Sequence, residues 1–411
     1  MLLTCLLPLL AAQVAASVAH DEPHVRNVAI VVYDGVELLD FAGPGEVFSA
    51  TRVDRTRSFR VYTVSDAKQE ITSQRFVHLT PEFTYEDCPA PDIVVVPGGN
   101  VPVRSESLRA FLQRCAEKSE LVMSVCNGAG ALAGAGLLDG REVTTHHGSL
   151  EWVQLMAPDT TVLSNRRFVD SGRILTAAGV SAGIDGALHV VARMLGEEVA
   201  HQTAEYMEYA WRPDEIAALH AQPGKRVVES PLLVVARRTF AQGPEGGLAA
   251  YRAAVAAGED VPSEERLNRV GYTQLSVNRI EHALDVFQLV TTLFPRSANA
   301  CDSLAEALER AGRNEDALHW TERSLTLSDT DATLTEDRKE LIRDAAEVRL
   351  ARLRGEGDAG GYACPPCGMP CDMRRYSEPG HCAASGCGAK LVLLEAPARE
   401  DGHGAGGDRP H

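Results

Sequence analysis

The first half of this sequence predicts an α/β fold in which helices cover both faces of a parallel sheet. Short apolar runs of strand length recur along it, and helix-like stretches such as 108–118 stand between them. The apolar runs are VAIVVY (28–33), FRVYTV (59–64), DIVVVP (92–97), ELVMSV (120–125) and ILTAA (174–178). Continuous Val- and Ile-rich runs, rather than alternating ones, are typical of strands buried on both faces.

Two helix-like stretches, 182–195 and 198–210, close this part of the chain, so the α/β domain is expected to occupy residues 25–211. From residue 212 the pattern changes. Residues 212–262 mix Pro, Gly and charged residues with a few helical stretches. This composition indicates a linker region.

Residues 263–352 contain an internal repeat. Identical residues recur 34 positions apart: Arg279 and Arg313, Ala283-Leu284 and Ala317-Leu318, and Leu293 and Leu327. A period of 34 resembles the tetratricopeptide repeat, in which helix pairs stack and hold a protein partner. The alternative is an ordinary helical hairpin. Residues 335–352 are expected to supply a capping helix.

The charge balance argues against a nucleic-acid partner. The chain has 411 residues, of which 57 are acidic and 40 are Lys or Arg, for a net charge of −17. No run of basic residues offsets this, so a phosphate backbone would repel the protein. Binding of metal cations is not excluded.

Residues 1–19 carry no charged side chain and end in Ser17-Val18-Ala19. Such a segment predicts a secretory signal peptide cleaved before His20, and therefore an exported protein, periplasmic or secreted. The alternatives are a misassigned start or a short membrane anchor. No stable membrane span is expected.

The most informative segment is SVCNGAGALAGAGLLDG at 124–140. A strand ending at Val125, a sharp Gly-rich turn and a helix would place the side chain of Cys126 in a strained, exposed position, a nucleophile elbow. The helix N-terminus would favour thiolate. The backbone amide of Asn127 and the turn at Gly98 and Gly99 are candidate donors to developing negative charge. The alternative is a buried structural cysteine.

Four blocks together resemble the ThiJ/PfpI superfamily, which is class I glutamine amidotransferase-like. They are YDGVELLDFAGPGEVF (33–48), VVVPGG (94–99), SVCNGAGALAGAGLLDGREVTTHH (124–147) and GVSAGIDGALHVV (179–191). The resemblance implies a flavodoxin-like sheet. The nearest branches are the isonitrile hydratases and the amidotransferase-like domains of AraC-type regulators.

The same resemblance implies roles for single residues. Cys126 matches the family nucleophile, Asp40 the acidic residue of the hydratases, and His146 a histidine that lies near the cysteine in some members. Asn127 replaces the usual Thr, and His147 stands where a Trp is usual, which widens or polarises that wall of the substrate site.

Each residue that would act with Cys126 also has a purely structural alternative. Asp40 would cap a turn and His146 would be a core residue, while Glu37 and Glu46 are interpreted as surface charges. PfpI-type proteases carry His directly after the Cys, where this chain has Asn127, so proteolysis is disfavoured. The domain is expected to need no cofactor.

A cysteine-rich module is expected at 362–395, after a Gly-rich hinge at 353–361 and before a disordered tail at 396–411. It resembles small heavy-metal-binding, zinc-ribbon-like modules, although its second cysteine pair is more widely spaced. The expected ligands of one structural zinc ion are Cys364, Cys367, Cys382 and Cys387, with Cys371 as a substitute. Four soft ligands joined by tight turns suit tetrahedral zinc. Disulfide pairing is the alternative.

Two functions follow. The first is a cysteine-dependent hydratase- or hydrolase-like enzyme acting on a small electrophilic carbon, with isonitrile hydration as the nearest analogue. The second is a non-enzymatic ligand-sensing or scaffold protein, with partner-binding repeats and a metal-binding tail. Both involve a small molecule, and a homodimer is also among the expected partners.

We predict about one zinc ion per chain, held by the cysteine module, because tetrahedral zinc takes four thiolates. The full chain, purified under reducing conditions, should contain it by elemental analysis. Changing both Cys364 and Cys367 to Ser should remove it. A double variant that binds as much zinc as the parent contradicts the assignment.

Overall fold

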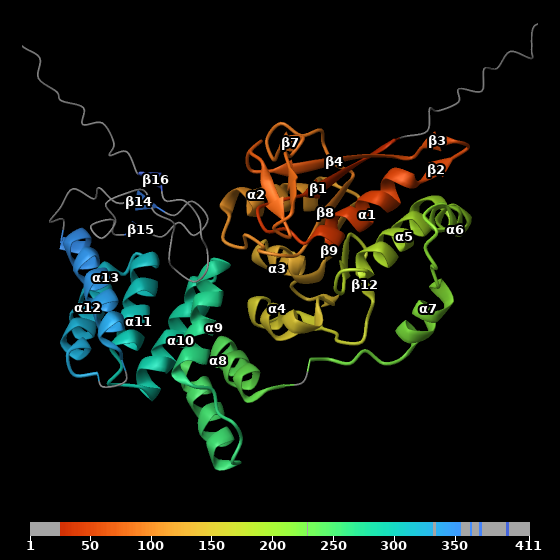
Figure 1. Ribbon diagram of the computed structural model, residues 1–411. Coiled ribbons are helices and arrows are strands. Elements are labelled where there is room, and N and C mark those ends of the chain that lie inside the picture. Colours follow the sequence, from red (N-terminus) through yellow and green to blue (C-terminus); the bar gives the residue numbers. More distant parts are fainter. Residues whose placement is uncertain are drawn as a thin grey trace, which may run out of the picture.

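The computed structural model describes residues 25–227, 229–331 and 334–354, together with the backbone of 362–363, 370–371 and 392–393. The expected signal peptide at 1–19 and the tail at 396–411 lie outside the described residues, as does most of the hinge at 353–361. Figure 1 shows an α/β domain, red to yellow, beside a group of helices, green to blue.

The main sheet has seven strands among the described residues, in the order β12-β13-β9-β8-β1-β4-β7. They are β1 (Arg26–Val31), β4 (Phe59–Ser65), β7 (Phe83–Thr84), β8 (Ile93–Val96), β9 (Leu121–Val125), β12 (Phe168–Asp170) and β13 (Ile174–Ala177). All neighbours pair in parallel except β12, which runs antiparallel to β13 at the edge.

Taken in chain order, the five central strands have the 2-1-3-4-5 arrangement of flavodoxin-like sheets. The predicted fold class of the first domain is therefore confirmed. Every residue of β8 and β9 is buried, which explains why their sequences are apolar without alternation.

Helices form a layer on each face of the sheet. On one face α1 packs against α5 and α6, and on the other α2 packs against α3. Their bounds are α1 (Leu38–Ala50), α2 (Glu106–Lys118), α3 (Ala129–Gly134), α4 (Leu150–Met156), α5 (Ala182–Leu195) and α6 (Glu197–Tyr206). The core includes the fully buried Phe48, Phe111, Met123 and Leu175.

Short elements complete the domain. They are β2 (Arg52–Val53), β3 (Thr56–Arg57), β5 (Ile71–Ser73), β6 (Val77–Leu79), β10 (Glu142–Val143) and β11 (Thr161–Val162), which form two-stranded sheets, and the 3-10 turns η1 (Cys126–Gly128) and η2 (His147–Ser149).

The residues 212–262 are more ordered than the expected linker region. They contain α7 (Pro213–Ala221) and α8 (Pro231–Ala256), and α8 packs against a later helix, α10. The buried Leu233 and Val235 supply that packing. Helix α8 is kinked at Gly243, where φ is +68°, just before Pro244. These two residues interrupt the helical sequence pattern, so the length of the helix is not evident from the sequence.

Among the described residues five further helices follow, and the starting points of the first four recur at the period seen in the sequence. They are α9 (Glu264–Ser276), α10 (Ile280–Leu293), α11 (Ala298–Arg310), α12 (Asn314–Ser328) and α13 (Glu336–Arg354). The start of α11 lies 34 residues after that of α9, and the start of α12 lies 34 residues after that of α10. Each helix packs against the next, so the chain continues as a helical region.

The cysteine module is described only as backbone. Here β14 (Tyr362–Ala363) pairs antiparallel with β15 (Pro370–Cys371) and β16 (Val392–Leu393). The side chains of the five expected zinc ligands lie outside the described residues. Among the described helices, none is both long and apolar enough to cross a membrane.

We expect Phe287→Ala to lower the free energy of unfolding of the helical region by about 3–5 kcal/mol. Phe287 is fully buried in α10, and a Cβ on Gly271 would lie 2.4 Å from its ring, so the two helices fit closely there. Denaturant unfolding monitored by circular dichroism measures the change. Val255→Ala in α8, where the side chain is 54% exposed, is the control and should change stability by less than about 0.5 kcal/mol. Equal stability of both variants would contradict the packing.

Candidate active site

Four segments that are distant in the sequence meet at the carboxyl edge of the sheet. Asp40 follows β1, Gly98 follows β8, Cys126 follows β9 and Val180 follows β13. The strand order reverses between β1 and β8, and open α/β sheets bind ligands at such a switch point.

Cys126 lies on a strained turn between β9 and α3. Its φ is +59°, a conformation that costs a non-glycine residue about 1–2 kcal/mol. Two backbone contacts hold it there. The Cys126 amide donates to the Ala178 carbonyl at 2.7 Å, and the Thr145 hydroxyl donates to the Cys126 carbonyl at 2.7 Å. The cysteine is free and only partly buried, and the predicted elbow is present.

Asp40 is fully buried beside this thiol. The Gly98 amide donates to its Oδ2 at 2.8 Å, and its carboxyl also interacts with the Cys126 thiol and the Val180 amide. Burial, and next the charge of Glu37, raise the pKa of Asp40 to about 7 against the opposing effect of these hydrogen bonds. At neutral pH the carboxyl therefore exists in both protonation states, as a proton carrier requires.

Gly98 brings these groups together. A Cβ at this position would lie 2.2 Å from Asn127 Oδ1, 2.8 Å from Asp40 Oδ2 and 2.9 Å from Cys126 Cβ. No other residue type fits without displacing them. The buried Tyr33 hydroxyl supports the turn, since it lies 2.6 Å from the Pro97 carbonyl oxygen and donates to it.

The Gly98 and Gly99 amides do not have the role that the sequence indicated. The Gly98 amide already donates to Asp40, and the Gly99 amide donates to Asn127 Oδ1 at 2.8 Å. The Asn127 side chain also donates from Nδ2 to the Gly99 carbonyl at 2.9 Å, so it clamps this turn from both sides. Neither glycine amide is left to face a substrate oxyanion.

The donors that do face the sulfur are the backbone amides of Asn127 and Val180. Only the first was expected from the sequence. Val180 has φ of +49°, which is rare for a β-branched residue, and strained backbone of this kind is concentrated at functional sites. Local sequence carries no signal for it, because valine disfavours this conformation.

The Cys126 thiol is not the thiolate that the sequence indicated. Burial, and next the charge of Asp40, raise its pKa to about 12, against the opposing effect of the two amides. The helix behind it, α3, is short, so its favourable dipole does not offset a buried carboxylate neighbour. The thiol thus holds its proton in the free protein, and Asp40 is placed to accept it.

His146 and His147 lie side by side next to Gly179 and Val180, and these two histidines are called the histidine wall. The partly buried His146 ring lies against Gly179, where a Cβ would be 2.5 Å from its Cδ2, and its Nδ1 accepts from the Gly148 amide at 3.1 Å. The His147 ring is exposed, with its centroid 4.1 Å from that of His146. Burial, and next His147, lower the pKa of His146, so it is neutral near pH 7.

Glu37 belongs with this wall and is not the plain surface charge that was expected. It is partly buried, and its charge acts on the pKa values of both Asp40 and His146. Glu46 is exposed, as expected.

Residues 26–193 match the DJ-1/PfpI family. The isonitrile hydratase of Pseudomonas putida is 30% identical over 192 residues, which cover 46% of this chain and 80% of the hydratase. This chain belongs to the DJ-1/PfpI family.

The DJ-1/PfpI domain is also similar to part of a transcriptional regulator and to a solved protein of the ThiJ/PfpI family. The HTH-type transcriptional regulator GbdR of Pseudomonas aeruginosa is 28% identical over 187 residues, or 45% of this chain, and the match spans about half (51%) of the regulator. The solved structure of a ThiJ/PfpI family protein from Pseudomonas syringae is 25% identical and has a TM-score of 0.42. The match covers 46% of this chain and 77% of the Pseudomonas syringae protein.

We expect Asp40→Asn to lower the pKa of the Cys126 thiol, because the negative charge of Asp40 raises it. The midpoint of the pH dependence of iodoacetamide alkylation at Cys126, followed by peptide mass spectrometry, should fall by roughly one to three pH units. Cys88 is an internal control, since burial rather than Asp40 raises its pKa. An unchanged midpoint at Cys126 would show that the two groups are not coupled.

Proposed function

We propose that the DJ-1/PfpI domain is a cysteine-dependent hydratase- or hydrolase-like enzyme that acts on a small electrophilic carbon, with an isonitrile as the nearest analogue. One observation carries the proposal: the Cys126 thiol contacts the buried carboxyl of Asp40, whose pKa is about 7. The 30% identity with an isonitrile hydratase over most of that enzyme supports it.

In the first step Cys126 Sγ attacks the terminal carbon of R–N≡C. Ionised Asp40 accepts the thiol proton and delivers it to the same carbon, so a thioimidate, R–N=CH–S–Cys126, forms without any change in redox state. The amides of Asn127 and Val180 hold the negative charge that the sulfur carries during the attack.

In the second step water adds to the thioimidate carbon. Asp40 removes a proton from the water and passes it to the nitrogen, and the tetrahedral adduct then releases the sulfur, which regains the proton of the new hydroxyl. The product is the formamide R–NH–CHO, and the balance is R–NC plus one water. In this proposal neutral His146, which lies against Gly179, and the neighbouring His147 face the side from which water or substrate approaches.

The second candidate function is a ligand-sensing or scaffold protein. The helical region, which the family match does not reach, favours it, as does the resemblance to a transcriptional regulator. In this proposal the helices from α9 to α12 are tetratricopeptide-like repeats that bind a protein partner. Their 34-residue recurrence supports that assignment.

Three further proposals concern features outside the described site. Residues 1–19 direct export, the cysteines from Cys364 to Cys387 hold a structural zinc ion, and the chain forms a homodimer. None of them is needed for the chemistry at Cys126.

We expect purified protein to convert an alkyl isonitrile to its formamide, measured by mass spectrometry. Cys126→Ser should abolish turnover, Asp40→Asn should lower it roughly 10²–10⁴-fold as for loss of a proton carrier, and His146→Ala should reduce it less. The rate should rise with pH through about 7, because ionised Asp40 is the form that accepts the thiol proton.

Cys88→Ser is the matched control and should retain activity, since Cys88 lies beside the Tyr85 carbonyl after β7 and not on the turns that carry Asp40 and Cys126. Isonitriles, 2-oxoaldehydes and simple amides should be screened together. If none is turned over, or if Cys126→Ser keeps full activity on a confirmed substrate, the ligand-sensing function takes precedence.

A further inference from the structure

The helix α4 connects the candidate active site to the helical region. His146 and His147 immediately precede it, through the turn η2. Figure 1 shows α4, in yellow, at the side of the α/β domain that faces α8 and α9. Its seven residues are too few to form a stable helix alone, so its position depends on what it packs against.

On the domain side, α4 packs against the elbow helix. A Cβ on Gly130 of α3 would lie 2.1 Å from Cη2 of Trp152, so the indole ring rests directly on the α3 backbone. Since α3 continues the turn that begins at Cys126, a shift of α4 moves both the elbow helix and the histidine wall.

On the other side, α4 is held by the helical region. Gln274 of α9 donates from Nε2 to the Leu155 carbonyl at 2.6 Å, and the Leu155 side chain packs in the apolar cluster of α8, α9 and α10. Glu151 of α4 accepts a hydrogen bond at 2.5 Å from Ser230, the residue that caps α8.

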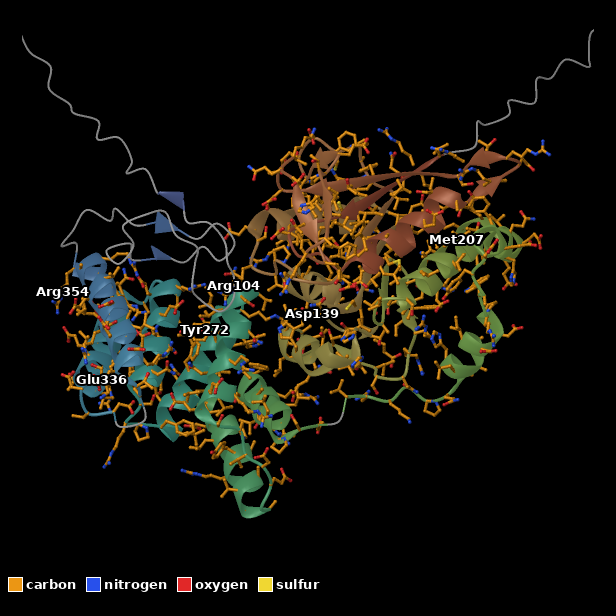
Figure 2. The ribbon with its side chains drawn as sticks, in the orientation of Figure 1. Arg104, Asp139, Met207, Tyr272, Glu336 and Arg354 are labelled. Carbon is orange, nitrogen blue, oxygen red and sulfur yellow. The ribbon has the colours of Figure 1, made fainter. Side chains whose placement is uncertain are left out.

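Contacts beside α4 fix the same boundary. Arg279 donates to both oxygens of Asp139 at 2.8 and 2.9 Å, and Val277 is buried within 3.6 Å of a Cβ placed on Gly134 of α3. Figure 2 labels Asp139 on the edge of the α/β domain next to the helices.

Gln274 is the most informative of these residues. Its side chain is fully buried, and it satisfies a carbonyl in the last turn of α4, where the helix itself supplies no donor. Its Oε1 has no hydrogen-bond partner among the described residues, and the same is true of Oδ1 of Asn268 in the same helix, so the hydrogen bond to Leu155 is what distinguishes Gln274.

We propose that Gln274 is a positioning residue for the active site: by holding α4, the helical region sets where His146 and the elbow helix lie and how far the Cys126 thiol is covered. The proposal rests on the proposed function only in taking Cys126 and His146 as the reactive site. It makes the helical region part of the reactive unit, so a partner bound to those helices would change the reactivity of Cys126.

Gln274→Leu in the full chain tests this, because leucine keeps the bulk and removes the hydrogen bond to α4. Asn268→Leu is the matched control: Asn268 is also a buried amide of α9, but its Nδ2 donates to Ser303 at 3.0 Å inside the helical region. Iodoacetamide alkylation of Cys126 is measured as a function of pH, beside thermal unfolding.

We expect Gln274→Leu to raise the alkylation rate of Cys126 roughly two- to thirtyfold, the range typical of distant positioning residues, and Asn268→Leu to leave it unchanged. Equal rates in both variants and the parent, or equal changes in both variants, overturn the proposal. If Gln274→Leu does not fold, Glu151→Ala, which removes the contact with Ser230, replaces it with the same expectation.

Alkylation needs no substrate, so this result is independent of the proposed reaction. Inactivity toward isonitriles with a faster Gln274→Leu alkylation rejects the reaction and keeps the coupling. If the parent is fully active and Gln274→Leu leaves the alkylation rate of Cys126 unchanged, the reaction is kept and the coupling is rejected.

Discussion

The buried carboxyl of Asp40 beside the Cys126 thiol is the constraint on which the rest of the site depends. Removing an ionisable group from water is costly unless hydrogen bonds replace its hydration. Here the Gly98 amide donates to Oδ2 and the Val180 amide helps to lower the pKa of the carboxyl, while Oδ1 has no hydrogen-bond partner among the described residues. Both amides come from turns at the ends of other strands. The flavodoxin-like sheet therefore matters chemically, because only its strand order brings these turns together.

This constraint also explains the distribution of charge. Asp40 and Cys126 cannot both lose their protons at small cost, since the charge of ionised Asp40 raises the pKa of the Cys126 thiol, whereas the hydrogen bond from the thiol lowers the pKa of Asp40. The pair is best described as one unit in which a proton moves from sulfur to carboxyl when the sulfur attacks. A ligand-sensing protein and an enzyme can share such a pair, and they differ in whether water completes the reaction.

The sequence predicted the parts that depend on local pattern. The buried strands β8 and β9 are evident from their apolar residues, and Cys126 from the small residues that follow it. Asp40 was assigned only through family resemblance. The role predicted for the Gly98 and Gly99 amides was wrong, because the partners of these amides are side chains 58 and 28 residues away in the sequence.

The extent of helix α8 could not be predicted for a similar reason, since a glycine followed by proline interrupts its sequence pattern although tertiary packing continues it. The role of the Val180 amide could not be predicted from the local sequence. Its left-handed backbone has a consequence for stability. Glycine at this position would relieve the strain of the turn, but it would also let the amide that faces the sulfur move. Backbone strain at Val180 and the fixed position of its amide are thus two sides of one constraint: a substitution that relieves the strain also loosens a donor to the sulfur.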